Sequence, residues 1–123
     1  MSQLRMSIAL ALVSFVTLAM SSTKAAADNY GAIAYSQESD SIGYSYDYQE
    51  QSSAEERALQ ECGEGCAVVL WFRNACGALA TGEGNGYGTA WATSRRAAEE
   101  AAVSTCSQYT QSCAVRQWVC TSR

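Results

Sequence analysis

The chain has 123 residues, of which 48% are hydrophobic, and it contains six cysteines, no histidine and no proline. The absence of histidine excludes Ser-His and Cys-His nucleophile pairs and the usual catalytic zinc sites. The formal net charge of −4 argues against nucleic acid and anionic membrane as partners. The remaining partner classes are cationic proteins, neutral glycans and metal ions.

The first 27 residues have the three-part pattern of a secretory signal. Arg5 gives a positive start, residues 7–20 form a 14-residue apolar run, and a stretch of small residues ends at Ala27. A membrane-spanning helix is the alternative, but it needs about 20 apolar residues. We expect cleavage before Asp28, no membrane insertion afterwards, and a secreted or periplasmic mature chain of residues 28–123. Its charge is 6 arginines minus 12 acids, or −6, because Arg5 and Lys24 leave with the signal.

The mature chain begins with two predicted strands, over residues 30–35 and 42–48. In the second strand the residues alternate with a period of two, which is typical of a half-buried strand. This alternation predicts that Tyr44, Tyr46 and Tyr48 share one face. The two strands are expected to pair as a hairpin.

A helix is predicted to follow. Ser53 and Glu56 have the spacing of a capping box. In this motif the Ser hydroxyl accepts a hydrogen bond from a free backbone N–H of the first turn, and the Glu carboxylate accepts one from the backbone N–H of the Ser. Gly63 or Gly65 is expected to end this helix. The run over residues 66–72 is apolar, β-branched and aromatic between two cysteines, which predicts a strand.

The same order of elements then recurs. We expect a strand over 76–80, a tight turn at Asn85-Gly86, a strand over 87–92, a helix over 95–106 capped by Thr93 or Ser94, and a strand over 113–120. The predicted fold class is therefore α+β, a tandem ββαβ duplication of antiparallel sheet with two helices. It forms a single domain over residues 28–123, with repeats at about 30–76 and 77–120.

Three strings in the chain resemble a known family. They are Tyr-Gly-Ala-Ile-Ala-Tyr-Ser at 30–36, Trp-Phe-Arg-Asn-Ala-Cys-Gly-Ala-Leu-Ala at 71–80 and Trp-Val-Cys at 118–120. The chain thereby resembles the bacterial exported family called domain-of-unknown-function family 4189, over essentially the whole mature region. The resemblance implies a small secreted or periplasmic single-domain protein. It brings no activity and no catalytic residues.

An even number of cysteines in a short exported chain predicts disulfides. The six residues are Cys62, Cys66, Cys76, Cys106, Cys113 and Cys120. Each repeat contributes three, so at least one bridge is expected to cross between the repeats. We favour Cys62–Cys66 and Cys106–Cys113 with a crossing Cys76–Cys120 bridge, although other pairings that respect the duplication remain open. A zinc half-site at Cys62 and Cys66 is the weaker alternative, because export favours oxidation.

A few side chains are candidates for a binding surface. The stripe of Tyr44, Tyr46 and Tyr48, with Trp91 on the corresponding strand, suits stacking on sugar rings. We favour the alternative that these rings pack on the alanine-rich helices, because small helix residues need large neighbours to fill space. Arg73, at the end of a central strand, is the candidate contact residue for a carboxylate.

The predicted function is a non-enzymatic binding module for a protein or envelope component, in the manner of an inhibitor or immunity protein. An acidic surface suits a basic partner enzyme. The alternatives are a small extracellular hydrolase using Glu and Asp side chains, or a glycan-binding module using the Tyr stripe. The acids available for hydrolysis are Glu55, Glu56, Glu99 and Glu100, whose place near the start of helices also has a structural explanation. We expect no catalytic residue, cofactor or metal.

Overall fold

The computed structural model describes Ser14 and residues 28–123, so the predicted signal falls almost entirely outside the described residues. The elements in chain order are β1 (Tyr30–Tyr35), β2 (Ile42–Tyr48), α1 (Gln51–Cys62), β3 (Ala67–Arg73), β4 (Cys76–Thr81), the short 3₁₀ helix η1 (Glu83–Asn85), β5 (Tyr87–Ala92), α2 (Arg95–Cys106) and β6 (Ala114–Cys120). This order confirms the α+β fold with a duplicated ββαβ unit.

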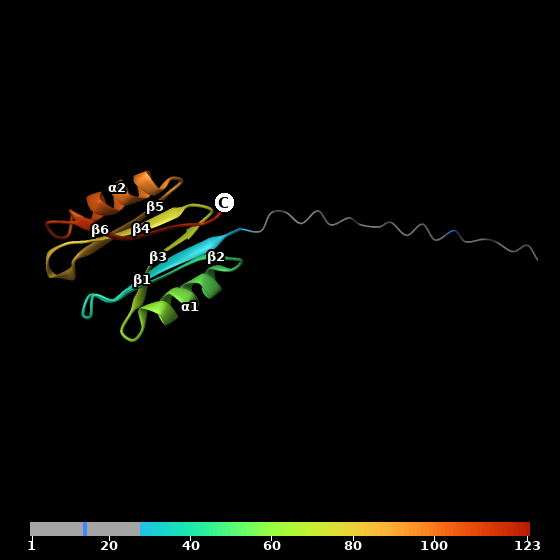
Figure 1. Cartoon of the computed structure of the whole chain (residues 1–123), viewed down its shortest axis with the longest axis horizontal. Helices are drawn as coiled ribbons and strands as arrows, with labels where there is room; N and C mark the ends of the chain where they lie inside the picture. Colours follow the sequence, from blue (N-terminus) through green and yellow to red (C-terminus); the bar gives the residue numbers. More distant parts are fainter. Residues whose placement is uncertain (1–13, 15–27) are drawn as a thin grey trace, which may run out of the picture.

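Each ββαβ unit forms its own three-stranded antiparallel sheet. The strand order is β2-β1-β3 in the first sheet and β5-β4-β6 in the second. Helix α1 packs mainly on β1 and β2, and α2 packs mainly on β4 and β5. The two sheets face each other and the helices lie outside them, which gives four layers (Figure 1). We refer to residues 30–73 as the first half and residues 76–120 as the second half.

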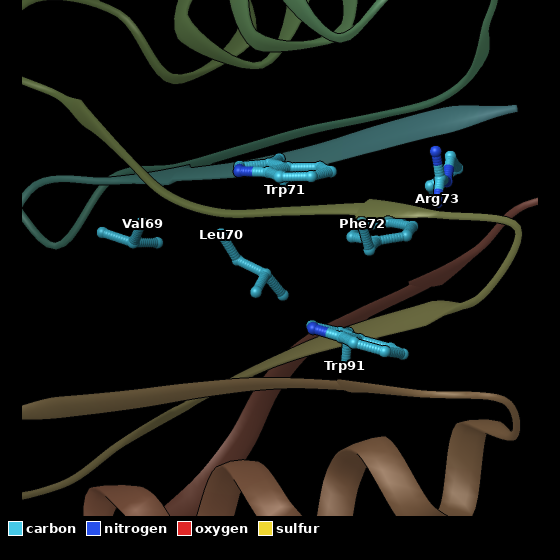
Figure 2. Close-up of a pocket in the computed structure, with 6 residues that line it drawn as sticks. All are labelled: Val69, Leu70, Trp71, Phe72, Arg73 and Trp91. Atoms are coloured by element: carbon cyan, nitrogen blue, oxygen red, sulfur yellow. The ribbon is translucent and has the colours of Figure 1, made fainter.

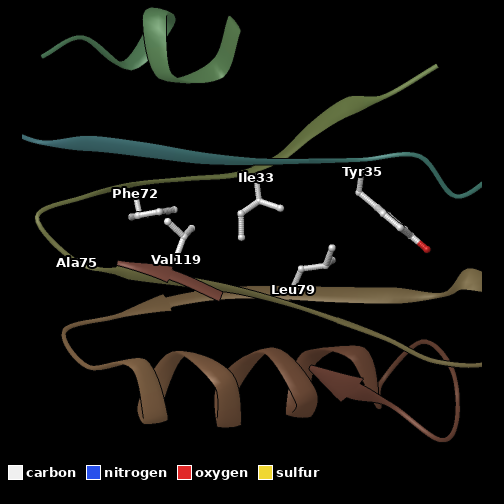
Figure 3. Close-up of a cluster of buried hydrophobic side chains, with 6 residues drawn as sticks. All are labelled: Ile33, Tyr35, Phe72, Ala75, Leu79 and Val119. Carbon is white, nitrogen blue, oxygen red and sulfur yellow. The ribbon is translucent and has the colours of Figure 1, made fainter. Parts of the chain in front are cut away.

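Alternation along the central strands divides the interior into three layers. Alanines of β1 and β4 face the helices, where the helices also present alanines, so helix and sheet approach closely. The larger apolar residues face the other sheet and build the core between the halves (Figure 3). This core consists of Ile33, Tyr35, Phe72, Ala75, Leu79 and Val119.

The three expected disulfides are present. Cys62–Cys66 and Cys106–Cys113 each join the end of a helix to the start of the next strand, with Cα–Cα distances of 6.1 Å. Cys76 and Cys120 are bonded directly opposite each other in β4 and β6.

The interpretation of the Cys76–Cys120 bridge as a tie between the repeats is wrong. Cys76 is the first residue of β4 and therefore belongs to the second half, as does Cys120. All six cysteines are paired, and each pair lies within one sheet and its helix. The halves are held together by the β3–β4 connection, by the core between the sheets and by polar contacts.

Five polar contacts join the halves outside the core. They are the ion pair Asp40–Arg116, the reciprocal pair Gln37–Asn85, the hydrogen bond from the Tyr35 hydroxyl to the Asn85 carbonyl, the hydrogen bond from the Thr89 hydroxyl to the Val69 carbonyl, and the bonds to Asp47 from Ser122, just after β6. They lie around the rim of the core, so they fix how one sheet sits on the other.

The predicted capping box of the first helix is wrong. Helix α1 begins at Gln51, three residues earlier than a cap at Ser53 predicts, and its cap residue Glu50 makes no side-chain cap hydrogen bond. Ser53 therefore lies inside the helix, because only two residues connect β2 to the helix. In α2, by contrast, Ser94 is the cap, and its hydroxyl accepts from the Ala97 backbone N–H at 3.2 Å.

The turn before β5 also differs from the predicted Asn85-Gly86 hairpin. The residues with positive φ are Gly84 (63°) and Asn85 (60°), whereas Gly86 has a φ of −60°. A Cβ on Gly86 would lie 2.7 Å from the Cβ of Thr110. Gly86 is therefore required by close packing against the segment after α2, and not by its backbone conformation.

Candidate functional site

A cleft of about 450 Å³ opens between one edge strand of each half, β3 of the first and β5 of the second. Its lining comprises Val69, Leu70, Trp71, Phe72 and Arg73 of β3 and Trp91 of β5. Leu70, Phe72 and Trp91 lie between the two sheets, while the Trp71 ring lies on the other side of β3, toward β1 (Figure 2). Trp91 is 60% exposed, so a large aromatic surface is available at this edge.

Strand register explains how β3 presents these side chains. Phe72 pairs with Gly31 and Leu70 with Ile33, so both point into the space between the sheets. Trp71 points the opposite way and packs beside Tyr30, with ring centroids 6.2 Å apart. A β-bulge at Val69 shifts the register, as bulges commonly do near binding sites.

The two ends of the cleft differ. At one end the Thr89 hydroxyl donates to the Val69 carbonyl at 3.1 Å and brings β5 against β3. At the other end lies Arg73, whose guanidinium is 3.6 Å from the Asp28 carboxylate and whose side chain is 57% exposed. Arg73 is the only charged residue in the lining, so the cleft is apolar with one cation at its mouth.

The structure brings two of the predicted surface residues together and separates the others. Arg73 and Trp91 line the same cleft. Tyr44 and Tyr46 lie at the opposite edge of the molecule, in a groove between β2 and β6. Sequence reasoning missed Leu70 and Phe72 as lining residues, because it gave no sign that β3 and β5 would be neighbours.

The expected tyrosine stripe is not continuous. Asp47 has a φ of 61°, and the register of β2 against β1 shifts at this point, which turns Tyr48 toward the α1 side. Tyr44 and Tyr46 are 43% and 51% exposed.

The prediction that all three rings pack on the helices is therefore wrong for Tyr44 and Tyr46. Between these two tyrosines it is Ser45 that faces α1, and its hydroxyl donates to the Ala54 carbonyl at 2.5 Å. A short polar side chain fits there because α1 lies very close to β2. A Cβ on neighbouring Gly43 would stand only 2.2 Å from the Ala58 carbonyl oxygen.

A polar cluster joins the halves at the end of the core. The Tyr35 hydroxyl donates to Asp40 at 2.9 Å, and Arg116 of β6 donates to the same carboxylate at 3.0 Å. Burial and the hydrogen bond to Asp40 raise the pKa of Tyr35 to about 12. The same hydrogen bond and the one from Arg116 lower the pKa of Asp40. This cluster serves to join the halves, since Tyr35 is buried against Tyr87 of the other half.

The charges of the two helices differ strongly. Helix α2 pairs Arg95 with Glu99 and Arg96 with Glu100, so its charges cancel. The segment 50–64 around α1 has a single arginine, which pairs with Glu61. Its other acids are Glu50, Glu55, Glu56 and Glu64. The acidity of the protein is therefore concentrated on the α1 side.

Within residues 28–123 no group of three or more His, Cys, Asp or Glu side chains is placed to hold a metal ion. The helices of this part of the chain are also too short and polar to cross a membrane.

Comparison with known proteins finds several mycobacterial proteins that are similar to this chain. The solution structure of Rv1813c from Mycobacterium tuberculosis is similar, with a TM-score of 0.58, 31% identity, and coverage of 75% of this chain and 74% of that one. Protein Rv1269c of M. tuberculosis and protein Mb1300c of Mycobacterium bovis are each 47% identical over 58 residues. That alignment covers 47% of this chain and 46% of each relative, so the match spans about half of their length. The model of the family described as "Domain of unknown function (DUF4189)" matches residues 30–120, and the chain belongs to this family.

Proposed function

We propose that this protein is a secreted or periplasmic, non-enzymatic binding module that accepts an extended segment of a partner protein in the cleft between β3 and β5. The observation that carries the proposal is a difference between the two copies of the edge strand. At equivalent positions, β3 has Val69 and Leu70 where β6 has Arg116 and Gln117.

This difference is informative because both strands occupy the same place in the same fold. Each is an edge strand with a β-bulge at the equivalent residue. Exposed edges are normally protected by charged residues, and β6 follows that rule with Arg116. Val69 and Leu70 pack partly against the core, but the copy shows that the fold accepts polar residues at these positions, so their apolar character exceeds what the fold requires. A binding role accounts for it.

The geometry suits recognition by strand addition. An edge strand offers unpaired backbone groups to an extended peptide, and neighbouring pockets select its side chains. Trp91 and Leu70 would provide the apolar contacts, and exposed Trp residues are frequent hot spots of protein interfaces. Arg73 would contact a carboxylate at the mouth of the cleft. A bulge at Val69 limits the register available to the incoming strand.

Two further properties agree with this proposal. Three disulfides in a small domain are typical of secreted and periplasmic proteins. The excess of acids on the α1 side would steer a partner with a basic surface, as in complexes of acidic inhibitors with basic enzymes. An inhibitor or immunity-type role is thus the finer form of the proposal.

The hydrolase alternative has less support. Glu55 and Glu56 lie on α1 and Glu99 and Glu100 on α2, and the two helices form opposite outer layers (Figure 1). Neighbouring residues on one helix also point in different directions, so neither pair converges on a substrate. A general acid needs a raised pKa, whereas the pKa of Asp40 is lowered.

The test is affinity capture with matched variants. Immobilised oxidised protein would be incubated with envelope extract and with culture supernatant, and the bound proteins identified by mass spectrometry. Trp91→Ala removes the exposed ring of the cleft. Tyr46→Ala is the matched control, because Tyr46 occupies the corresponding position at the opposite edge.

We expect a partner that is retained by the wild-type protein and by Tyr46→Ala but lost with Trp91→Ala. Thermal unfolding of each variant would check that both remain folded. Retention of the same proteins by Trp91→Ala would contradict the assignment of the cleft.

A further inference from the structure

A second groove lies at the opposite edge of the molecule, between β2 and β6. It has a volume of about 350 Å³ and is lined by Tyr44, Tyr46, Gln117, Trp118, Val119 and Cys120. The duplication relates it to the β3/β5 cleft, since β6 corresponds to β3 and β2 to β5. Its volume is at the lower end of the range of about 300 to 1,000 Å³ for small-molecule sites. The fold therefore provides the same kind of hollow twice.

The chemistry of this groove differs from that of the cleft. Gln117 replaces Leu70, and Cys120, which is in a disulfide, replaces Arg73, so the lining has no charged residue. Charged groups near its ends already have partners in the protein. Asp47 bonds to Ser122, Arg116 to Asp40, and Arg57 to Glu61. The arginines beside the groove, Arg116 and Arg57, are paired with acids, and the net negative charge of the protein disfavours an anion.

The aromatic rings of the groove are open to contact. Tyr44 and Tyr46 project from β2 on the side that faces the other sheet, and both are about half exposed. The same two residues also line an adjoining hollow of about 240 Å³ on the α1 side, next to Arg57 and Glu61. The rings thus form a ridge between two hollows. Such a ridge suits stacking against flat apolar faces of a ligand.

Hydrogen-bonding groups accompany the rings. Each tyrosine hydroxyl both donates and accepts. The Gln117 amide nitrogen donates to the Trp118 carbonyl at 2.8 Å, which fixes the side chain and leaves its oxygen to accept from a ligand. Uncharged groups that donate and accept, beside aromatic faces, match a ligand that has many hydroxyls and no charge.

We infer that the β2/β6 groove binds a neutral oligosaccharide, stacked on Tyr44 and Tyr46 and hydrogen-bonded to Gln117. This site is separate from the protein-binding cleft proposed above and involves none of its lining residues. A failure of either proposal therefore leaves the other standing.

The test is a titration of the oxidised protein, labelled with ¹⁵N, with chitotetraose, cellotetraose and maltotetraose, followed by two-dimensional NMR. Tetragalacturonate serves as the anionic control. We expect at least one neutral tetrasaccharide to shift the amide signals of residues 44–46 and 117–119, and tetragalacturonate to shift none of them. Tyr46→Ala should weaken that binding about tenfold, which corresponds to about 1.4 kcal/mol. Tyr46→Phe should keep it within about threefold, because the ring remains.

Trp91→Ala, in the equivalent position of the other edge, is the matched variant and should leave saccharide binding unchanged. Several outcomes would overturn the inference. They are no shift with any of the neutral tetrasaccharides, shifts confined to residues 69–73, unchanged binding by a folded Tyr46→Ala protein, and shifts that follow protein concentration alone, which would indicate contact between two copies.

Discussion

The two halves of the molecule contain the same elements in the same order, but they differ in how the central strand is linked to the last strand. In the second half, Cys76 and Cys120 form a disulfide between β4 and β6. At the equivalent positions of the first half, Tyr30 is paired with Arg73 in β1 and β3. The second half is thus fastened by two bridges, while the first half has only Cys62–Cys66.

This difference shows which features belong to the fold and which belong to one copy. A sheet of this kind forms without a bridge between its strands, since the first half has none. Without the bridge, the end of β3 has Arg73 at the mouth of the cleft. At the equivalent end of β6, the residue in the place of Arg73 is Cys120, which is in a disulfide. The half with fewer disulfides therefore has the edge with more side-chain groups available for binding.

The largest loss of stability is expected from substitutions in the core that both halves share. Phe72 is 1% exposed and lies between Gly31 and Gly77, one glycine from each half. Phe72→Ala should lower the free energy of unfolding by about 3 to 5 kcal/mol, measured by urea denaturation. Val119→Ala, at the equivalent position, removes less volume and should cost about 2 kcal/mol. Equal losses for the two variants would contradict the unequal roles assigned to these residues.

Removal of the Cys76–Cys120 bridge should have the next largest effect. Its 45-residue loop constrains the unfolded chain by roughly 4 kcal/mol, against roughly 2 kcal/mol for the short loop of Cys62–Cys66. The double variant Cys76→Ser, Cys120→Ser should also lose amide-exchange protection first in β4 and β6. Loss of protection mainly in β1 and β3 would show that the bridge acts on the other half.

The contact of Tyr35 with the second half predicts a loss of stability at alkaline pH. Because its pKa is raised from 10.0 to about 12 in the folded protein, the stabilisation is complete below pH 10 and is lost as the pH rises through 12. The ultraviolet absorbance of tyrosinate should show a late-ionising group that Tyr35→Phe removes. A late group that persists in Tyr35→Phe would assign the shift to another tyrosine.

The smallest change in stability is expected from substitutions at the first turns of the helices, where the halves also differ. Ser94 caps α2, so Ser94→Ala should cost about 1 kcal/mol. Ser53 lies within α1 and caps nothing, so Ser53→Ala should change stability by less than about 0.5 kcal/mol. Thermal denaturation of the two variants gives the comparison. A larger loss of stability in Ser53→Ala would instead support the capping box that the sequence predicts.

Patterns in the sequence were sufficient to predict the helices and strands, the duplication and the favoured disulfide pairing. Period-two alternation and the small residues of the helices act over a few neighbouring residues, whereas the favoured disulfide pairing came from cysteine spacing matched between the repeats, with Cys76 and Cys120 separated by 44 residues. The turn of Tyr48 toward α1 was not predictable in this way, because one residue in the left-handed region, Asp47, reverses the alternation after it. The start of α1 depended on the short link from β2 and not on Ser53.

The candidate site was predictable only as separate residues. Arg73 and Trp91 were identified singly, but their convergence depends on the two sheets stacking so that β3 lies next to β5. That stacking is set by the shared core and its rim contacts, which join residues far apart in the chain. The assignment of the Cys76–Cys120 bridge to a link between the repeats was wrong for a simpler reason, since a repeat boundary placed one residue late put Cys76 in the first half.

The most direct test of the two-halves account is to cut the chain once, at a protease site introduced between Asn74 and Ala75 in the β3–β4 connection. The cut protein should remain one species in native buffer, held by the core between the sheets. In denaturant without reductant it should separate into two fragments, because each disulfide lies within one half. A single covalent species under those denaturing conditions would show a bridge between the halves and contradict the account.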